Sequence, residues 1–201
     1  MDKYNYSYLD NKGIYCYKDS DVLINKLNIQ DAEMFFKIER LYSGMRQTEL
    51  NLKPLKGNLD FEHLKAIHRY LFQDLFYWAG CVRTVAIAKQ NMFCLPQFID
   101  ACAKDIFAKL RNDNYYVGYS KEEFIDAITE LFADINALHP FREGNGRAQR
   151  EFIKYVACKN GYGLDWSVVS SEENIEASFE STNGNNTKLH AIIKKIIYRL
   201  K

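Results

Sequence analysis

The sequence predicts an all-α fold, a helical bundle interrupted by one short β-hairpin. Only 10 glycines and 3 prolines occur in 201 residues, which is few for a β-sandwich that turns about every ten residues. Apolar residues recur at intervals of three and four along most of the chain, as on the buried face of a helix. One stretch, residues 82–95, instead has two β-rich runs around a polar turn.

Caps and apolar stripes place the individual helices. The strongest signal is a capping box at Ser120 and Glu123, ahead of an apolar stripe that ends at Leu138. Asp31 is a candidate N-cap for an earlier helix, and Gly161 is the expected end of a later one. The predicted helices cover residues 31–41, 60–78, 98–110, 120–138, 146–160, 171–179 and 186–200.

No repeat, charge block or linker-like stretch divides the chain. We therefore expect one domain over residues 31–201, with residues 1–30 as an N-terminal extension packed on its core.

The charge balance excludes some classes of partner. Lys and Arg total 27 against 26 Asp and Glu, a net charge of +1, so a general nucleic-acid or anionic-membrane binder is not expected. No apolar run approaches the roughly 18 residues that span a bilayer, and the start of the chain lacks the pattern of a signal peptide. These features predict a cytoplasmic protein with neither nucleic acid nor membrane as a partner.

The cysteines and histidines do not form a metal-binding pattern. Five cysteines are scattered without a CxxC pair, and the four histidines form no HExxH motif. A disulfide framework or a protein-ligated transition metal is therefore not expected.

The chemically richest stretch lies between two predicted helices, at residues 139–150 with the sequence HPFREGNGRAQR. Gly144 and Gly146 allow a tight turn and the close approach of a ligand. The amides of a helix that begins there form a site for an anion such as phosphate. Arg147 and Arg150 are three residues apart, so both can project toward that anion. The stretch therefore indicates a polyphosphate site.

Two more residues of this stretch suggest chemistry on a bound phosphate. Glu143 is the kind of single carboxylate that binds Mg²⁺ beside phosphates, because phosphate oxygens and water complete the shell of this ion. His139 can act as a general base at neutral pH. Each residue alone has an ordinary structural explanation, but their combination between two helices does not.

The stretch fills every position of the motif HxFx(D/E)GNGRxxR, and the chain therefore resembles the Fic family. Flanking segments at residues 67–72, 78–85 and 161–166 resemble that family too, so the resemblance covers about residues 14–166. It implies a Fic-type helical bundle with a hairpin flap. It also implies transfer of AMP from ATP to a Ser, Thr or Tyr hydroxyl of a target protein, with pyrophosphate as the leaving group.

The resemblance implies a role for each motif residue. His139 would deprotonate the attacking hydroxyl, Glu143 would hold Mg²⁺, and Phe141 would anchor the loop in the core. The nucleotide phosphates would be bound by Gly144, Asn145, Gly146, Arg147 and Arg150. Among these, the first three would supply amides to an anion hole, the Asn145 side chain would reach the α-phosphate, and the arginines would hold the β- and γ-phosphates.

The hairpin matches the flap of the family, which binds an extended segment of the target by strand addition. The resemblance implies nucleotide contacts for Lys89 and Gln90. It implies target contacts for Val85, Ala86, Ile87, Ala88 and Phe93. A plain structural ribbon explains the same hairpin nearly as well.

Many Fic proteins carry an inhibitory helix with the pattern (S/T)xxxE(G/N). The closest candidate here, Glu173, has Val169 at the position of the hydroxyl residue, so the pattern fails. No glutamate follows Glu180, and nothing before Asp60 fits. The chain thus resembles the class whose inhibitor is a separate small antitoxin protein, with Arg150 as the residue that an external glutamate would occupy.

Two other functions stay open. Relatives with altered motifs transfer other phosphate-containing groups, such as phosphocholine, although the intact Gly146 and Arg147 disfavour phosphate transfer. A module that senses nucleotide or a partner protein without catalysis is the alternative outside enzymology. The oligomeric state is left open by the sequence.

Overall fold

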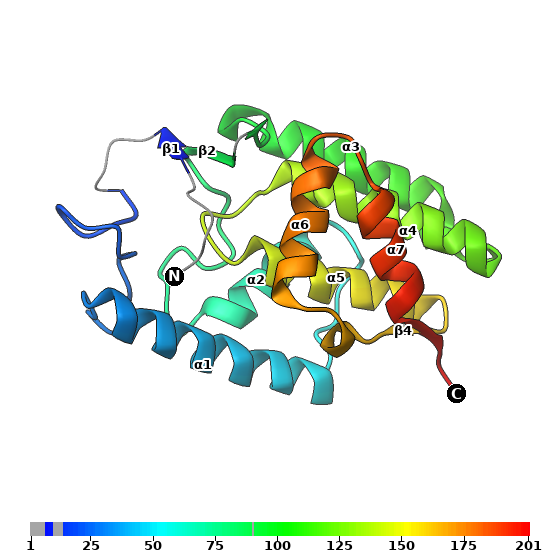
Figure 1. Ribbon diagram of the computed structural model, residues 1–201, viewed down its shortest axis with the longest axis horizontal. Helices are drawn as coiled ribbons and strands as arrows, with labels where there is room; N and C mark the ends of the chain where they lie inside the picture. Colours follow the sequence, from blue (N-terminus) through cyan, green and yellow to red (C-terminus); the bar gives the residue numbers. More distant parts are fainter. Residues whose placement is uncertain (1–6, 10–13, 90) are drawn as a thin grey trace.

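The computed structural model describes residues 7–9, 14–89 and 91–201, which form a mainly helical domain (Figure 1). Its α-helices are α1 (Ala32–Leu52), α2 (Phe61–Phe72), α3 (Ile99–Asn112), α4 (Lys121–Leu138), α5 (Asn145–Lys159), α6 (Ser171–Thr182) and α7 (Thr187–Ile196). Short 3₁₀ turns lie at Pro96–Phe98, Asn114–Tyr116 and Trp166–Val168. The strands are β1 (Ser7–Leu9), β2 (Ala86–Lys89), β3 (Asn91–Met92), β4 (Tyr162–Leu164) and β5 (Ile197–Arg199). The predicted all-α fold with a hairpin is confirmed.

The predicted helix starts are confirmed by their caps. The Asp31 carboxylate accepts a hydrogen bond from the Met34 amide at 2.7 Å. Ser120 and Glu123 form the expected capping box at the start of α4. These bonds satisfy amides that have no acceptor within the helix.

The helix predicted over residues 60–78 ends early, at Phe72. The carbonyls of Gln73 and Leu75 accept hydrogen bonds from Lys26, through its ammonium group at 2.6 Å and its amide at 2.8 Å. The N-terminal segment therefore binds backbone groups that a longer helix would use internally. The buried apolar residues between Phe72 and Trp78 lie in a turn after α2, where they pack on the core without being helical.

The predicted C-terminal helix also ends early, at Ile196, because the chain then pairs with β4 as strand β5. Leu164 pairs with Ile197, and Gly163 pairs with Tyr198. A Cβ atom on Gly163 would lie 2.2 Å from the Tyr198 ring, so a larger residue there would displace that exposed side chain. Each of the two small sheets therefore contains a strand pairing between segments that are distant in sequence, β1 with β2 and β4 with β5.

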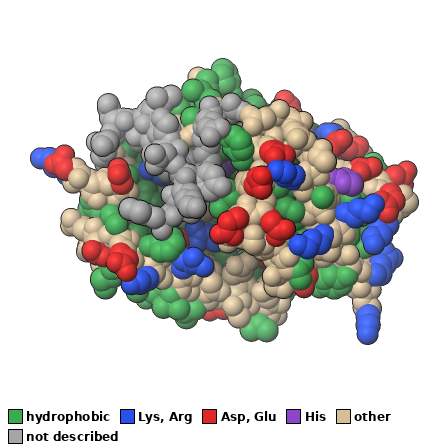
Figure 2. Space-filling view, viewed as in Figure 1, with side chains coloured by type: hydrophobic (Ala, Val, Ile, Leu, Met, Phe, Trp, Pro, Cys, Tyr) green, Lys and Arg blue, Asp and Glu red, His purple; other side chains and the backbone are tan. Residues whose placement is uncertain are grey.

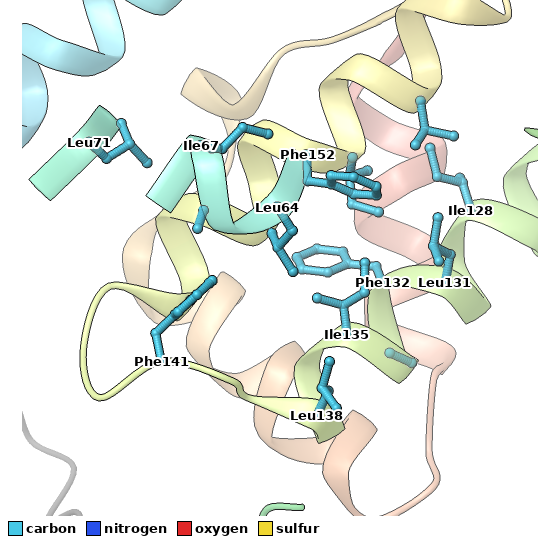
Figure 3. Packing of buried hydrophobic residues seen from close by; sticks show 14 of the residues in the cluster. Leu64, Ile67, Leu71, Ile128, Leu131, Phe132, Ile135, Leu138, Phe141 and Phe152 are labelled. Carbon is cyan, nitrogen blue, oxygen red and sulfur yellow. The ribbon is translucent and has the colours of Figure 1, made fainter. Parts of the chain in front are cut away.

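The core lies between α2, α4 and α5, and Figure 3 shows their apolar side chains meeting there. Leu64 and Ile67 come from α2, Phe132 comes from α4 and Phe152 comes from α5, and all four are buried. Phe141 follows the end of α4, and its ring turns inward beside these residues (Figure 3). The connection between α4 and α5 is therefore anchored in the core.

The segment before α1 packs on the same body. Tyr15 is buried, and its ring meets Trp78 edge to face at 5.6 Å between centroids. Residues 1–6 and 10–13 of the expected extension lie outside the described residues. The division of the chain at residue 30 stays a prediction.

The distribution of surface charges and the composition of the helices can be compared with the predictions on charge and on membrane spans. On the face in Figure 2, Lys and Arg side chains lie among Asp and Glu side chains. Within the part of the chain that is described, no helix has both the length and the apolar composition needed to cross a bilayer.

His68 joins α2 to two other segments. Its Nδ1 accepts a hydrogen bond from the Gly80 amide at 2.8 Å, and its Nε2 is 2.9 Å from the carbonyl oxygen of Glu143. Because Nδ1 is an acceptor, Nε2 carries the proton and donates to that carbonyl, and the ring is neutral. The ring stacks on Phe141 at 3.8 Å between centroids. His68 therefore holds the loop between α4 and α5 in place.

This geometry predicts a pH-dependent stability. Burial lowers the pKa of His68 to about 3, so between pH 6.5 and 3 the unfolded chain binds a proton that the folded chain does not. Acidification therefore favours unfolding. Between pH 7 and 5, the titration of His68 lowers the free energy of unfolding by about 2 kcal/mol. We expect His68→Gln to be less stable than the wild type at pH 7. Between pH 7 and 5, its free energy of unfolding should fall by about 2 kcal/mol less than that of the wild type. Denaturant unfolding at each pH measures it.

His190→Gln is the matched control, because His190 is partly exposed and contacts Asp126 on the surface. An equal loss of stability in the wild type and in His68→Gln would contradict the prediction.

Candidate functional site

The predicted catalytic histidine lies where α4 ends. His139 adopts a left-handed backbone conformation with φ of 43°, and its amide donates to the Ile135 carbonyl at 3.1 Å. A non-glycine residue in this conformation is strained and needs support from its surroundings. The sharp turn directs the chain away from the axis of α4 and begins the loop that carries the motif.

Arg83 provides that support. Its guanidinium donates to three carbonyls, those of His139 at 2.7 Å, Val85 at 2.6 Å and Cys94. Burial lowers the pKa of Arg83 to about 10, which leaves it charged at neutral pH. The His139 ring also stacks on Phe93, with 3.8 Å between centroids. One buried cation therefore ties both sides of the hairpin to the backbone of the candidate base.

Gly144 begins α5 and needs to be glycine. Its φ is +78°, and a Cβ atom there would lie 2.3 Å from the Phe72 ring. Its amide donates to the Glu143 carboxylate at 2.9 Å. In the structure the Glu143 carboxylate occupies this amide, and its expected part in an anion hole stays a prediction. The amides that lack an acceptor within α5 are those of its first turn, which begins at Asn145.

The Asn145 side chain has a structural use. Its Oδ1 accepts from the Phe141 amide at 2.9 Å, and its Nδ2 donates to the Phe141 carbonyl at 2.7 Å. We expected this side chain at the α-phosphate, but here it closes the loop on itself. Phe141 is fully buried, as expected of an anchor. Its ring and its backbone are held by different partners, His68 and Asn145.

The two arginines have different surroundings. The Arg147 guanidinium makes an ion pair with Glu39 of α1 at 2.5 Å and lies over the Phe72 ring. Arg150 forms no ion pair with a described residue and lies 5.9 Å from the centroid of the Trp166 ring. Burial, and then the charge of Arg147, lower the pKa of Arg150 to about 10. Arg150 is therefore a half-buried cation for which an anion would be a favourable partner.

These groups line one pocket beneath α6. Gly146 also lines it, and a Cβ atom there would lie 3.3 Å from the Arg150 guanidinium. The lining also includes the motif residues His139, Glu143, Gly144, Arg147, Gln149 and Arg150 and the α6 residues Asn174, Ile175, Ser178, Phe179 and Thr182. Among the described residues no cluster of three metal-ligating side chains occurs, so Glu143 is the single carboxylate available to a metal there.

The flap residues divide into three groups. Val85, Ile87 and Phe93 are buried, so their side chains contact the protein itself. Ala86 and Ala88 lie in β2, which pairs with β1 on one side and β3 on the other. We expected a target segment to add to the hairpin as a strand, and in the structure β1 already pairs with the side of β2 away from β3. Lys89 ends β2, its side chain is outside the described part, and Gln90 lies outside the described residues.

Sequence reasoning missed several residues that support the site. Arg83 and His68 entered only as parts of resembling segments or as structural residues, although each contacts the motif loop. Glu39 belongs to no motif in the sequence. A signal was available for it, since a carboxylate four residues after Phe35 falls on the apolar face of the predicted helix.

The comparisons with known proteins agree with this geometry. Residues 58–157 match the model of the Fic/DOC family. The protein adenylyltransferase VbhT of Bartonella schoenbuchensis is 36% identical over 178 residues, which are 88% of this chain and 37% of VbhT. This chain therefore spans little more than a third of that relative. A Sinorhizobium fredii protein named "Probable protein adenylyltransferase y4lH" is 38% identical, with 90% of this chain and 94% of that protein covered.

Solved structures give the same result. The BepC protein of Bartonella tribocorum with bound AMPPNP superposes with a TM-score of 0.86 at 25% identity, covering 93% of this chain and 97% of that one. The N-terminal Fic domain of a Bep effector from Bartonella quintana with bound ADP gives 0.86 at 27% identity, covering 93% and 95%. With the motif loop and these relatives together, the chain belongs to the Fic/DOC family.

Proposed function

We propose that this chain transfers AMP from ATP to a hydroxyl side chain of a target protein and releases pyrophosphate. The observation that carries the proposal is the pocket in which a histidine, a carboxylate, two arginines and a helix N-terminus meet. Relatives named adenylyltransferases, and neighbours with bound AMPPNP and ADP, support it.

Each group then has one task. The His139 imidazole accepts the proton of the target hydroxyl as its oxygen attacks the α-phosphorus of ATP. The bond from that phosphorus to the bridging oxygen of pyrophosphate breaks, and the electron pair leaves with pyrophosphate. Arg147, Arg150 and the first turn of α5 hold the charge of the β- and γ-phosphates.

The nucleoside end is proposed to lie against α6. Ile175 and Phe179 give this side of the pocket an apolar surface. The Oδ1 atom of Asn174 is buried and has no hydrogen-bond partner among the described residues. A buried carbonyl oxygen without a donor is unfavourable, and an amino group of a purine base would satisfy it.

We propose Mg²⁺ as the metal, held by Glu143. This carboxylate is about one-third exposed and lines the pocket beside both arginines. A single carboxylate with phosphate oxygens and water is a suitable ligand set for this ion. When bound, Mg²⁺ neutralises phosphate charge. Because ATP and Mg²⁺ are supplied together in the cytoplasm, we also propose that compartment for the activity.

The function is tested with α-labelled ATP. We expect His139→Ala to lower labelling of the target by about 10² to 10⁴-fold, because the general base is lost, while ATP still binds. Incorporated label is measured in a host lysate with Mg²⁺ and with a chelator, which should abolish the signal. His190→Ala on α7 is the control and should label at the wild-type rate.

Full-rate labelling by His139→Ala would contradict the proposed base. Label from γ-labelled ATP would indicate phosphate transfer instead. No labelling by the wild type, with intact ATP binding, would favour the alternative of a nucleotide-sensing module.

The target is proposed to enter through the flap as an added strand. Because β1 pairs with β2 at Ser7–Ala88, Tyr8–Ile87 and Leu9–Ala86, the edge of β2 is already covered. A target strand that binds β2 must therefore replace β1. The backbone of β1 then competes with the target for the same hydrogen bonds.

Tyr8→Pro tests this competition, since proline removes an amide donor from β1 and is disfavoured within strands. We expect target labelling to rise by about twofold or more. Tyr8→Phe keeps the backbone donor and should leave labelling unchanged. Lower labelling by Tyr8→Pro would mean that the target adds to β1 instead of replacing it.

We further propose an inhibitor on a separate small protein. A groove beside the active site runs along the first half of α1 and residues 20–23 and reaches Arg150. Arg150 has no carboxylate partner in the described part of the chain, so a glutamate supplied by another protein can pair with it.

The measurement is growth and target labelling in cells that express the chain alone or together with each small open reading frame that adjoins its gene. The chain alone is expected to slow growth and label targets, and the small protein is expected to suppress both. His139→Ala alone should be harmless. Unchanged growth and labelling on co-expression would contradict the proposed inhibitor.

A further inference from the structure

Glu39 is a charged residue on the buried face of α1. It is 8% exposed, and Phe35, Ser43 and Leu50 are the other buried residues of this helix. Its Oε1 lies 2.5 Å from Nη1 of Arg147. A buried carboxylate is costly unless a partner compensates it, and here the partner is the first arginine of the motif.

Ser43 completes the contact one turn further along α1. Its hydroxyl donates to the Glu39 carbonyl at 2.8 Å and accepts from Arg147 Nη1 at 2.8 Å. Nη1 is therefore bound by two groups of the same helix. Such a pair of contacts fixes the direction of the guanidinium plane.

The rest of the Arg147 side chain is also constrained. Its guanidinium carbon lies 4.7 Å from the centroid of the Phe72 ring, and Nη2 lies 4.0 Å from a Glu143 oxygen. Nη2 and Nε donate no hydrogen bond to any residue that the structure describes. One nitrogen is thus held by α1, while the other two are left for a ligand in the pocket that Arg147 lines.

We infer that Glu39, assisted by Ser43, is a positioning residue that orients Arg147 toward the polyphosphate end of the nucleotide. This inference rests on the proposed function. An arginine that is free to rotate loses side-chain entropy when it binds phosphate, whereas one already held by α1 loses less. Glu39 contributes to phosphate binding although it faces the arginine and not the phosphate.

The alternative is competition, in which the Glu39 carboxylate withdraws Arg147 from the phosphates. The two hypotheses predict opposite effects of removing the carboxylate on ATP affinity. Loss of the carboxylate weakens ATP binding if Glu39 positions Arg147, and strengthens ATP binding if Glu39 competes with the phosphates. Because AMP lacks the β- and γ-phosphates, its affinity reports on the rest of the pocket.

The experiment is calorimetric titration of the full chain with ATP and with AMP, both with Mg²⁺. For Glu39→Gln we expect about tenfold weaker ATP binding and less than a twofold change for AMP, because the charged partner of Arg147 is lost. Ser43→Ala should weaken ATP binding by about two- to threefold. Glu39→Asp keeps the charge and should recover part of the ATP affinity.

Glu33→Gln is the matched control. Glu33 lies on the same helix, is largely exposed and pairs with Lys37, so both affinities should stay at the wild-type values. In an Arg147→Ala background, Glu39→Gln should cause no further loss of ATP affinity, since the group that it positions is gone.

Tighter ATP binding by Glu39→Gln would overturn the inference in favour of competition. Equal losses for ATP and AMP would overturn it in favour of a general role in folding. A wild-type chain that binds neither nucleotide would overturn the proposed function, and this inference with it. Normal binding by the wild type together with unchanged ATP affinity in Glu39→Gln would overturn the inference alone.

Discussion

The arrangement of the site depends on the contacts of the buried His68 imidazole. The ring accepts a hydrogen bond from the Gly80 amide and donates one to the Glu143 carbonyl, while its face packs on Phe141. A neutral histidine can do both because its two nitrogens have opposite roles. The motif loop is thereby fixed to α2 at the residue that is the candidate metal ligand. Protonation would turn the acceptor into a donor and break this bridge.

Arg83 gives the loop a second connection, to the hairpin. Its three carbonyl acceptors belong to His139, Val85 and Cys94, which lie at the end of α4 and on both sides of the flap. The strained backbone of His139 is therefore stabilised by the element that is proposed to bind the target. The positions of the proposed base and of the proposed target-binding hairpin are therefore coupled through one buried side chain, Arg83.

Much of this arrangement could be predicted from the sequence, because local signals carry it. The capping box at Ser120 and Glu123 and the cap at Asp31 depend on neighbours within four residues, and both were found. The ends of α2 and α7 were missed because distant segments decide them. Lys26 binds carbonyls after α2, and β4 pairs with the chain after Ile196. No local pattern reports such partners.

In the site, too, local sequence signals were predictive and contacts between distant segments were not. A contiguous motif brought His139, Glu143, Arg147 and Arg150 to one pocket, as the spacing predicted. The roles of the side chains were less predictable, since Asn145 bonds to the loop backbone and not toward the pocket. Residues that contact the motif from far away in sequence carry no motif of their own. Glu39 was detectable only as a charge on the apolar face of α1.

The two arginines show how one repeated residue type acquires two functions. Arg147 is held by a carboxylate of its own chain, so its charge is compensated before any ligand binds. Arg150 has no such partner in the described chain, and burial together with the charge of Arg147 lowers its pKa. An anion that enters the pocket therefore gains more from Arg150, whether it is a phosphate or a carboxylate of another protein. A nucleotide and an inhibitory glutamate would then compete for the uncompensated charge of Arg150, while α1 keeps Arg147 directed toward the nucleotide phosphates.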